Sequence, residues 1–415
     1  MRVEIRPSRA RGLVTAPPSK SMAHRLLICA GLAEGESVVR NLAYSEDVKA
    51  TIACLRSLGV QITLDGDTAY VKGVDVTKPL GMTAVLPCNE SGSTLRFFIP
   101  ICLLSKEERV LTGSRRLMDR PLIVYEQIAQ HQKLKFEITA KHVTVQGPMY
   151  NADFLAAGDT SSQFFSGLLF ALPLLNKKSY LRIREPVESR PYIDMTVLAL
   201  KQFGIAVRAW NDSEENRLVI EIPGGKYTPA DVTVEGDYSN AAFFEALNYA
   251  GSNVRVRGLR EDSAQGDKAY KILFKKINEA MKIVNFDAVD ISDCPDLGPV
   301  LFAVAALTGG GRFTGTRRLK FKESDRANAM KHELAKFGIR VDVDENDVIV
   351  HPGELHAPTE ALCGHNDHRI VMALSVLLTA TGGVIEGAEA VNKSFPDFFE
   401  RLQDLGVDLT YGMDQ

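Results

Sequence analysis

Six short polar clusters in this sequence each open directly into an apolar run rich in small residues. Ser, Asp and Asn placed just before an apolar run cap helices, because their side-chain oxygens accept the free N–H groups of the first turn. A helix N-terminus also carries a partial positive charge, so each cluster predicts a place where an anion can bind. Their near-regular spacing indicates a repeat architecture that handles a multiply anionic ligand. The clusters are residues 18–21 (PSKS), 90–93 (ESGS), 159–163 (DTSSQ), 237–240 (DYSN), 294–297 (CPDL) and 366–369 (NDHR).

The first cluster adds cationic side chains to its helix start. Lys20 and Ser21 fall in the first predicted turn, and Arg25 follows about one turn later on a neighbouring face. A solvated basic helix start is the alternative, but cations there oppose the helix dipole, and an ordinary helix would carry acidic residues instead. We therefore predict that backbone N–H groups, the ammonium and the guanidinium together bind a phosphate.

The third cluster presents two hydroxyls and an amide at a helix start. Ser161, Ser162 and Gln163 are suited to fixing a polyol or a phosphate, and plain capping is the alternative. Because Asp159, Thr160 or Ser161 could cap the helix alone, Ser162 and Gln163 remain available for a ligand.

Two later segments also carry cations at predicted helix starts. Residues 320–326 (KFKESDR) combine cations with carboxylates, and on their own they are more typical of a solvated helix start. Arg369 instead opens a helix that is otherwise wholly apolar, residues 370–379. Burying an arginine there is costly unless an anion pairs with it, so Arg369 is a predicted anion ligand.

Asp296 lies between Pro295 and an apolar helix and is a candidate general base. Capping of that helix explains an aspartate here equally well, and the sequence leaves both readings open. A GxxxxGK[ST] phosphate loop, a GxSxG elbow and a GxGxxG motif after a strand are all absent, and residues 309–311 (GGG) are typical of a turn.

Metal and disulfide chemistry are not indicated. His365 and His368 could serve as metal ligands, but no third ligand stands at a suitable spacing, so we predict no metal site. The six cysteines lie far apart without a CxxC pair, which favours reduced structural thiols over a disulfide framework or a zinc site.

Composition limits the remaining classes. A chain of 415 residues is too long for one ordinary core, and 45% hydrophobic with 24% charged residues is ordinary for a globular protein. A net charge of −3 argues against a general nucleic-acid binder. The start of the sequence lacks the apolar stretch of a signal peptide, and no run is long enough to cross a membrane. We expect a soluble, cytoplasmic protein.

A second signal repeats in step with the polar clusters. A helix end, a glycine cap and an alternating strand recur at residues 55–64, 200–209, 334–343 and 402–410, with weaker copies near 131–144 and 277–291. The first three copies are followed by a turn and a second strand, which predicts hairpins. The chain thus divides into about six units of roughly 70 residues each.

Six units divide naturally into two globules of three. A boundary in the polar stretch 228–236 predicts one domain of residues 18–235 and another of 1–17 with 236–415, because the sixth unit needs a strand from the start of the chain. The apolar helices, such as 164–175 and 297–307, should be buried with sheets packed outside them. Two connections, near 17–18 and 235–236, predict a hinge.

Ten strings appear in the same order along the whole chain as in one known family. Taken together they resemble the enolpyruvyl transferase family, in the branch that uses shikimate 3-phosphate. The strings are PPSKSMAHR, ESGSTLR, LMDRP, GDTSSQFFSG, ESRPYID, EGDYSNA, PDLGP, KESDRA, NDHRI and NKSFPDFF.

The resemblance implies a two-domain inside-out α/β barrel fold, built from six βαβαββ repeats, with the active site in the cleft between the domains. It implies that the enolpyruvyl group of phosphoenolpyruvate is transferred to the 5-hydroxyl of shikimate 3-phosphate by addition and elimination. Phosphate is released, in a step toward chorismate and the aromatic amino acids. No cofactor is expected, and the protein is expected to be a monomer.

The resemblance also assigns roles to individual residues. Lys20, Ser21 and Arg25 would contact the substrates, with Lys20 reaching both. Asp296 and Glu323 would transfer protons, assisted by Lys20. Shikimate 3-phosphate would further be held mainly from the N-terminal domain by Ser161, Ser162, Gln163, Ser189, Asp296 and Lys322, with Tyr192 nearby. Phosphoenolpyruvate would be held by Gly92, Arg120, Gln163, Arg326, Arg369 and Lys393.

Four positions depart from the family pattern. Glu90 stands where Asn is common, Ser93 where Thr is usual, and Phe97 where Pro is common. Arg318 occupies the place of a substrate-contacting Asn. These changes bear on the shape of the phosphoenolpyruvate pocket, and through it on sensitivity to glyphosate.

Two alternatives remain. The related transferase that uses UDP-N-acetylglucosamine pairs its first lysine with Asn and carries a reactive Cys on a loop, whereas here Ser21 follows Lys20 and residues 115–120 contain no Cys. A non-catalytic repeat scaffold that binds phosphorylated ligands would need no carboxylates beside its cations, so Asp296 and Glu323 argue against it.

Overall fold

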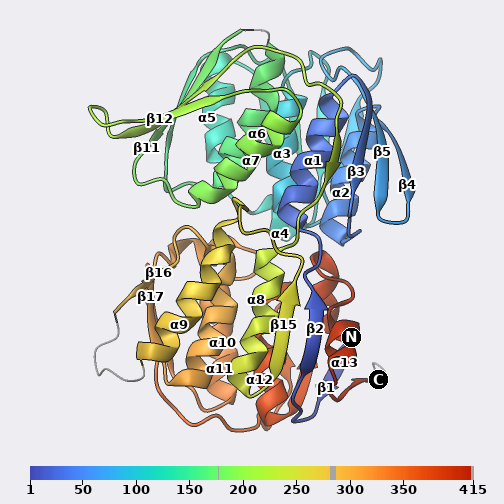
Figure 1. Cartoon of the computed structure of the whole chain (residues 1–415). Coiled ribbons are helices and arrows are strands. Elements are labelled where there is room, and N and C mark those ends of the chain that lie inside the picture. Colours follow the sequence, from blue (N-terminus) through green and yellow to red (C-terminus); the bar gives the residue numbers. More distant parts are fainter. Residues whose placement is uncertain (176, 281–286, 413–415) are drawn as a thin grey trace. The chain divides into compact units, whose positions relative to one another are not determined.

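The computed structural model describes residues 1–175, 177–280 and 287–412 (Figure 1). The chain divides into two compact units. We call Pro18–Glu235 the N unit, and Met1–Pro17 together with Gly236–Gln415 the C unit.

In the described part of the N unit, an inner group of helices is buried almost completely. These helices are α1 (Lys20–Leu32), α3 (Gly92–Cys102) and α6 (Ser162–Ala171), and α3 packs against α6. Amphipathic helices flank them, and α7 packs against both α1 and α6. The flanking helices are α2 (Glu46–Ser57), α4 (Arg115–Met118), α5 (Ile123–Gln132) and α7 (Arg190–Gln202).

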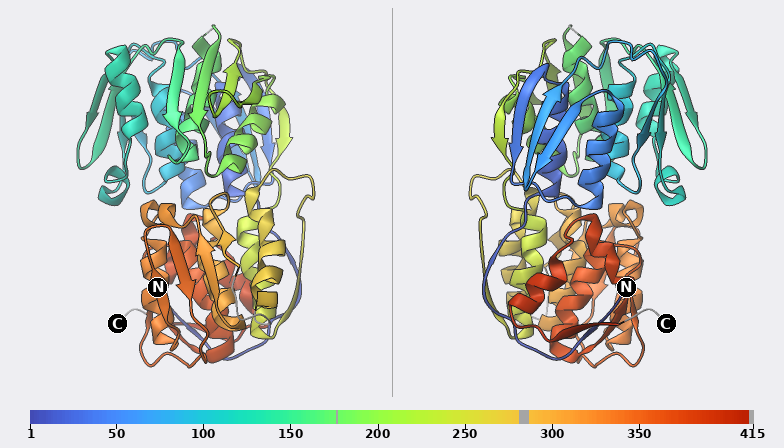
Figure 2. Two further views of the ribbon diagram at one scale, coloured as in Figure 1. Left: turned by 90° about the vertical axis from the view of Figure 1, so that its left-hand side faces the viewer. Right: turned by 90° about the vertical axis from the view of Figure 1, so that its right-hand side faces the viewer.

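The strands of the N unit form four-stranded sheets that flank the inner helices (Figure 2). In each sheet, a parallel pair is extended by an antiparallel hairpin, which is the βαβαββ arrangement. The sheet orders are β14-β3-β5-β4, β6-β7-β9-β8 and β10-β11-β13-β12. The strands are β3 (Gly35–Arg40), β4 (Gln61–Asp65), β5 (Thr68–Gly73), β6 (Ala84–Pro87), β7 (Arg109–Thr112), β8 (Lys135–Ile138), β9 (His142–Gln146), β10 (Asp153–Ala157), β11 (Ser179–Arg184), β12 (Arg208–Asp212), β13 (Arg217–Ile222) and β14 (Asp231–Thr233).

The described part of the C unit repeats this plan. Its inner helices are α8 (Tyr238–Ala246), α10 (Gly298–Thr308) and α12 (His368–Thr381), and α10 packs against both others. Its outer helices are α9 (Tyr270–Ala280), α11 (Arg326–Lys336) and α13 (Phe398–Asp404). Its strands are β1 (Arg2–Ile5), β2 (Arg11–Thr15), β15 (Asn253–Arg257), β16 (Val289–Asp290), β17 (Gly311–Thr314), β18 (Val341–Val343), β19 (Asp347–Val350), β20 (Leu362–Cys363), β21 (Gly383–Glu386) and β22 (Leu409–Gly412).

The start of the chain belongs to the C unit through its strands. β1 pairs antiparallel with both β21 and β22, so it supplies the strand that the sixth repeat needs. β2 pairs in parallel with β15. The fourth repeat departs from βαβαββ among the described residues, where it contributes only this parallel pair. Its predicted strand segment near 277–291 lies partly outside the described residues.

The repeated helix–glycine–strand segment is confirmed in all four strong copies. A helix in each case ends two residues before a glycine in the left-handed region, which lacks a Cβ and so adopts this conformation without strain, and a strand follows. The weaker copy after α5 uses Lys133 at a φ of 56° instead. The glycines and their φ angles are Gly59 (90°), Gly204 (81°), Gly338 (84°) and Gly406 (89°).

The polar clusters cap the inner helices with one exception. Side chains that accept a backbone N–H of the first turn are those of Ser19, Ser91, Ser161, Asp237 and Asp367. The capping interpretation of Asp296 is wrong, because it lies in the 3-10 helix η4 (Pro295–Leu297), and Leu297 holds the N-cap position of α10 without a side-chain hydrogen bond. The Asp296 carboxylate is therefore available for other partners. Among the described residues, no helix combines the length and apolarity needed to cross a lipid bilayer.

Candidate active site

Lys20 is the first residue of α1 and is largely buried. Its Nζ lies 2.9 Å from Oδ2 of Asp47, and the two side chains are 13% and 12% exposed. Asp47 lies in the first turn of α2, where a carboxylate is favoured by the helix dipole. The sequence reasoning missed Asp47, because acidic residues in a first turn are common and gave no sign of a partner 27 residues away. The ion pair fixes the Lys20 ammonium at the helix start.

Arg25 is buried one turn further along α1. Its Nη1 donates to the Ser21 carbonyl (2.6 Å), its Nη2 to the Tyr192 carbonyl (2.9 Å) and its Nε to Oγ1 of Thr196 (2.9 Å). Burial lowers the pKa of Arg25 to about 10, so the guanidinium remains charged at neutral pH. Arg25 therefore ties α1 to α7 and sets the positions of Ser21 and Tyr192. Ser189, predicted to bind substrate, is buried at the N-cap position of the same helix α7.

The N-termini of α3 and α6 meet through Gln163. Its Oε1 accepts from Nη1 of Arg96 (2.7 Å), and its Nε2 donates to Oγ of Ser93 (2.9 Å). Arg96 is buried and was not among the predicted site residues, although it stands in the ESGSTLR string. Ser161 caps α6, and Ser162 is its buried first residue. The predicted residues of α3 and α6 thus form one polar cluster inside the N unit.

Gly92 opens α3 and lies against Arg120. A Cβ at Gly92 would collide with Nη1 of Arg120, so only glycine leaves room for the guanidinium there. Arg120 is half-buried and follows the short helix α4. The departure at Phe97 lies deeper, where its ring packs 5.3 Å from the ring of Phe170 and 5.3 Å from Cζ of Arg25. Glu90 immediately precedes the cap residue of α3.

Asp296 is the centre of the candidate site in the C unit. Its Oδ1 lies 3.1 Å from Nζ of Lys322 and 2.8 Å from Nη1 of Arg326, and its Oδ2 lies 3.1 Å from Nη2 of Arg369. Burial alone would raise the pKa of Asp296, but the charges of Arg369, Lys322 and Arg326 hold it well below its usual range. Asp296 is therefore an ionised carboxylate surrounded by cations.

Arg326 is the most strongly paired cation of this group. Beyond Asp296, its Nη2 donates to Oε2 of Glu323 (2.6 Å) and its Nε to Oδ2 of Asp367 (2.9 Å). The side chains of Arg326 and Asp367 are 1% and 0% exposed. The solvated helix start that residues 320–326 suggested is therefore wrong for Arg326. The pKa of Lys322 is lowered, chiefly by burial. The charge of Asp296 acts against this shift, whereas the charges of Arg326 and of Arg318, on η5 (Arg317–Phe321), add to it.

Arg369 and Lys393 complete the cationic group around the start of α12. Arg369 is buried in the first turn of α12, and its backbone N–H donates to the Asp367 cap at 3.0 Å. Lys393 ends η6 (Ala388–Lys393), and its Nζ donates to the Asn366 carbonyl at 2.6 Å. The predicted residues of the C unit thus gather around the start of α12 and the partly buried carboxylate of Asp296.

Asp267 is a buried carboxyl that the sequence reasoning missed. Oγ of Ser239, on the first turn of α8, donates to Oδ2 of Asp267. Burial raises the pKa of Asp267 to about 7, with the charge of Asp296 acting in the same direction and that of Arg369 opposing it. No string near position 267 drew attention to it, so only the structure reveals this neighbour of Asp296.

The two histidines considered as metal ligands point to different partners. His368 is buried on α12, with Nδ1 3.9 Å from Oδ1 of Asp367. Nε2 of His365 instead lies 2.7 Å from Oε1 of Glu333 on α11. His365 and His368 therefore do not form a shared site.

The polar cluster of the N unit and the cationic group around Asp296 in the C unit contain the kinds of side chain that bind anions and transfer protons. Buried guanidinium and ammonium groups pair with carboxylates, and each such pair is a place where a phosphate or carboxylate of a ligand can compete. Carboxyls whose pKa values are moved apart, such as Asp296 and Asp267, are typical of acid–base sites.

Comparison with known proteins gives one family for nearly the whole chain. The family model described as EPSP synthase (3-phosphoshikimate 1-carboxyvinyltransferase) matches residues 5–402. The 3-phosphoshikimate 1-carboxyvinyltransferase of Clostridium kluyveri is 38% identical over 98% of both chains, and that of Clostridium perfringens is also 38% identical over 98% of both.

Solved structures agree in fold. An EPSP synthase from Acinetobacter baumannii superposes with a TM-score of 0.75 at 24% identity, covering 99% of this chain and 100% of the other. The enolpyruvyl transferase NikO from Streptomyces tendae gives 0.74 at 16% identity, covering 99% and 98%. At these identities the superpositions establish the enolpyruvyl transferase fold, as expected from the sequence.

Proposed function

Because the chain belongs to the EPSP synthase (3-phosphoshikimate 1-carboxyvinyltransferase) family, we infer that it transfers the enolpyruvyl group of phosphoenolpyruvate to the 5-hydroxyl of shikimate 3-phosphate. Phosphate is released, and the product leads toward chorismate and the aromatic amino acids. Two findings carry this inference: the family match over residues 5–402, and the 38% identity to a named relative over 98% of both chains. The cation-enclosed carboxylate of Asp296 supports it, because the reaction needs both anion binding and a base.

We propose that the clusters of both units act on the same pair of substrates. Each substrate carries a carboxylate and a phosphate, and unpaired buried charges cost several kcal/mol each. Charge-assisted hydrogen bonds contribute about 1.5–3 kcal/mol apiece and offset that cost. Shikimate 3-phosphate is assigned to Lys20, Ser21, Arg25, Ser161, Ser162, Gln163, Ser189, Asp296 and Lys322, and phosphoenolpyruvate to Lys20, Gly92, Arg120, Gln163, Arg326, Arg369 and Lys393.

Arg25 takes a positioning role in this proposal. Its guanidinium is committed to the carbonyls of Ser21 and Tyr192 and to the hydroxyl of Thr196. Its assignment as a direct contact of shikimate 3-phosphate stays part of the proposal, because these contacts would hold the guanidinium in place for the ligand. Arg25 holds the substrate-facing backbone of α1 and α7 and adds positive charge behind it.

Binding of the anionic substrates would convert Asp296 into a better base. Lys322, Arg326 and Arg369 pair with its carboxylate in the ligand-free protein and keep its pKa low. When these cations turn to phosphate and carboxylate oxygens of the substrates, the carboxylate loses partners and its proton affinity rises. Asp296 then accepts the 5-hydroxyl proton as the oxygen attacks C2 of phosphoenolpyruvate.

Glu323 or Lys20 delivers a proton to C3 in the same step, which leaves a tetrahedral ketal. The group that delivered this proton then takes a proton back from C3, which re-forms the double bond as the C–O bond to phosphate breaks, with the electron pair leaving on phosphate. We propose that the connections near 17–18 and 235–236 act as a hinge whose closure excludes water. A fall in the radius of gyration on adding both substrates, measured by small-angle X-ray scattering, tests the hinge.

A phosphate-release assay tests the reaction directly. We expect phosphate only when both substrates are present, together with the enolpyruvyl product. Asp296→Asn and Glu323→Gln should each lower kcat at least a hundredfold, whereas Asp397→Asn, an exposed control on the same unit, should not. Phosphate release without shikimate 3-phosphate would contradict the scheme. Substrate binding without turnover by the wild type would instead favour the non-catalytic scaffold.

We further propose that the enzyme works as a monomer in the cytoplasm, as the family resemblance leads us to expect. Sedimentation at several protein concentrations measures the first point, and fractionation of the source cells measures the second. A mass of twice 45.6 kDa in sedimentation would contradict the monomer.

A further inference from the structure

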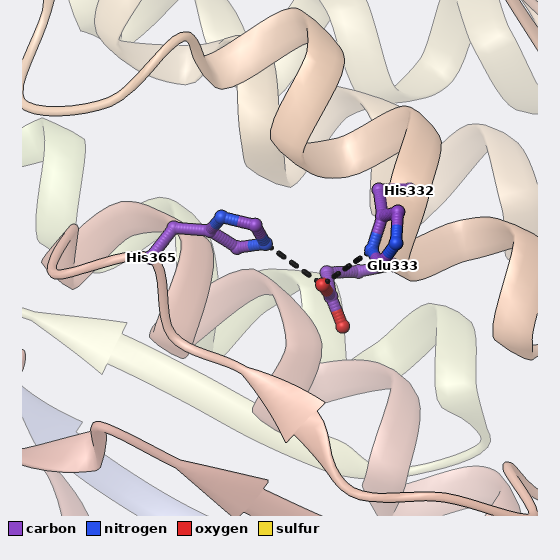
Figure 3. Close-up of side chains that lie close together, drawn as sticks. All are labelled: His332, Glu333 and His365. Atoms are coloured by element: carbon purple, nitrogen blue, oxygen red, sulfur yellow. Dashed lines mark hydrogen bonds and ion pairs between the residues drawn. The ribbon is translucent and has the colours of Figure 1, made fainter.

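A group of possible metal ligands lies in the C unit outside the candidate active site. His332 and Glu333 on α11 and His365 in the loop before α12 form what we call the His–Glu–His cluster (Figure 3). Nδ1 of His332, Oε1 of Glu333 and Nε2 of His365 all lie within 4.8 Å of one another. The sequence marked His365 as a possible metal ligand but not its partners, because His365 stands 32 residues from Glu333.

The geometry of the cluster suits a divalent transition-metal ion. Oε1 of Glu333 lies 3.0 Å from Nδ1 of His332 and 2.7 Å from Nε2 of His365. A metal with bonds of about 2.0–2.2 Å to imidazole and carboxylate ligands separates adjacent donor atoms by roughly 3.0–3.5 Å. The two imidazole nitrogens would have to move away from Oε1 by no more than about 0.8 Å, and exposed His332 can move.

The carboxylate is prepared as a ligand by the groups behind it. Glu333 is 0% exposed, and its second oxygen, Oε2, lies 3.0 Å from Nζ of Lys336 and accepts from the backbone N–H of Cys363 at 3.0 Å. These partners leave Oε1 directed at the two imidazoles. Ligating carboxylates are commonly held in this way by hydrogen bonds to their other oxygen. Lys336 also offsets the charge of the carboxylate, which favours a site with two neutral imidazoles.

We propose that His332, Glu333 and His365 bind one divalent first-row transition-metal ion, with zinc as the representative. Two imidazole nitrogens and one carboxylate oxygen are ligands that zinc, cobalt and nickel accept, whereas calcium and magnesium prefer oxygen alone. The ion enters from solvent beside His332, whose side chain is 68% exposed. Water completes its coordination.

The ion would link α11 to the loop that leads into α12. Both helices begin at the candidate active site, since Arg326 opens α11 and Asp367 caps α12. His365 and Asn366 have positive φ angles of 49° and 50°, so this loop holds a conformation that side chains rarely adopt. A bond from the metal to His365 therefore secures the loop two residues before the cap. The role is structural, and the proposal does not depend on the reaction.

Zinc binding to the full chain tests the proposal. Protein stripped with a chelator is titrated with Zn²⁺ by calorimetry, and with Co²⁺ while the visible absorption of the bound ion is followed. We expect one ion per chain, and at least a tenfold loss of affinity in both His332→Ala and His365→Ala. His131→Ala, at an exposed histidine at the end of α5, is the matched control and should bind like the wild type. Cys363→Ser should also bind normally, because the ligand set does not include its exposed thiol.

Two outcomes overturn the proposal. One is a wild-type affinity no higher than that of the double variant His332→Ala/His365→Ala. The other is loss of binding in Cys363→Ser with His332→Ala unchanged, which would place the ion on the thiol instead. A melting temperature that Zn²⁺ raises in the wild type but not in the double variant provides a second readout, and circular dichroism of the metal-free variants confirms that they fold.

Discussion

The buried pair of Arg326 and Asp367 should dominate the stability of the C unit, and Asp367→Asn isolates its charge. Asp367 accepts from Nε of Arg326 at 2.9 Å and from Nη2 at 3.3 Å, and also from Oγ of Ser324 at 3.0 Å. Its cap bond from the Arg369 N–H survives the substitution, because Asn caps helices as well as Asp does. The change therefore removes the negative charge while it leaves the cap and the volume in place.

The magnitude follows from burial. The side chains of Arg326 and Asp367 are 1% and 0% exposed, and breaking such a pair from one side costs about 3–5 kcal/mol. For a unit of about 200 residues, each kcal/mol lowers the melting temperature by about 2–4 °C, which predicts a fall of roughly 6–20 °C. Asp397→Asn is the matched control. Its carboxylate lies 2.7 Å from Nε of Arg401 but is 42% exposed, so its loss should cost less than about 1 kcal/mol.

Calorimetry and far-ultraviolet circular dichroism are the appropriate assays. The single tryptophan, Trp210, lies in β12 of the N unit, so its fluorescence does not report on the C unit. The transition of the C unit should move in Asp367→Asn while Trp210 fluorescence follows an unchanged N unit. A free energy of unfolding within about 1 kcal/mol of the wild type would refute the reasoning, since it would mean that Arg326 needs only Asp296 and Glu323.

Three further predictions concern single residues. Gly92→Ala should push the Arg120 guanidinium away and raise the KM for phosphoenolpyruvate about tenfold, which corresponds to about 1.4 kcal/mol, with little change in stability. Steady-state kinetics measures this KM. An unchanged KM would show that Arg120 does not bind this substrate. Arg25→Lys should destabilise the N unit by about 3 kcal/mol, because lysine cannot replace the hydrogen bonds to Ser21, Tyr192 and Thr196. Urea unfolding followed by Trp210 fluorescence measures this loss, and a loss below about 1 kcal/mol would contradict the prediction. Asp267 has a folded-state pKa of about 7, raised chiefly by burial, so the native state holds a proton that the unfolded chain has released, and the free energy of unfolding should fall as pH rises from about 4 to about 7. Asp267→Asn should lack this fall, and a wild type and variant with parallel pH profiles in urea unfolding would disprove the assignment.

Local signals in the sequence predicted the elements well because their causes are local. A serine or aspartate before an apolar run caps a helix through atoms within three residues, as Ser19, Ser91 and Asp367 do. A glycine two residues after a helix end predicts a left-handed cap for the same reason, as at Gly59. The need for a strand from the start of the chain followed from counting repeats, and β1 supplies it.

The side-chain partners could not be predicted, because they join segments that are distant in the sequence. Asp47 reaches Lys20 from the next helix, and Glu333 reaches His365 from 32 residues away. Asp296 shows the same limit in another form, because an aspartate before an apolar helix looks like a cap from its neighbours alone. Its contacts with Lys322, Arg326 and Arg369, which come from two other segments, are what distinguish a candidate base from a helix cap.

The pairing within the C unit explains how a site for anions can exist in a folded, ligand-free protein. Lys322, Arg326 and Arg369 buried without partners would repel one another and would each pay a large desolvation cost. Asp296, Glu323 and Asp367 neutralise them, but unequally. Asp367 is wholly buried, and its carboxylate both caps α12 and pairs with Arg326. The side chains of Asp296 and Glu323 are instead 16% and 18% exposed. The carboxylates that must release a cation to a substrate are therefore the two that water reaches, and these are the two that we propose as proton-transfer groups. Because Asp367 keeps hold of Arg326, Asp296 and Glu323 can change partners without unfolding the unit.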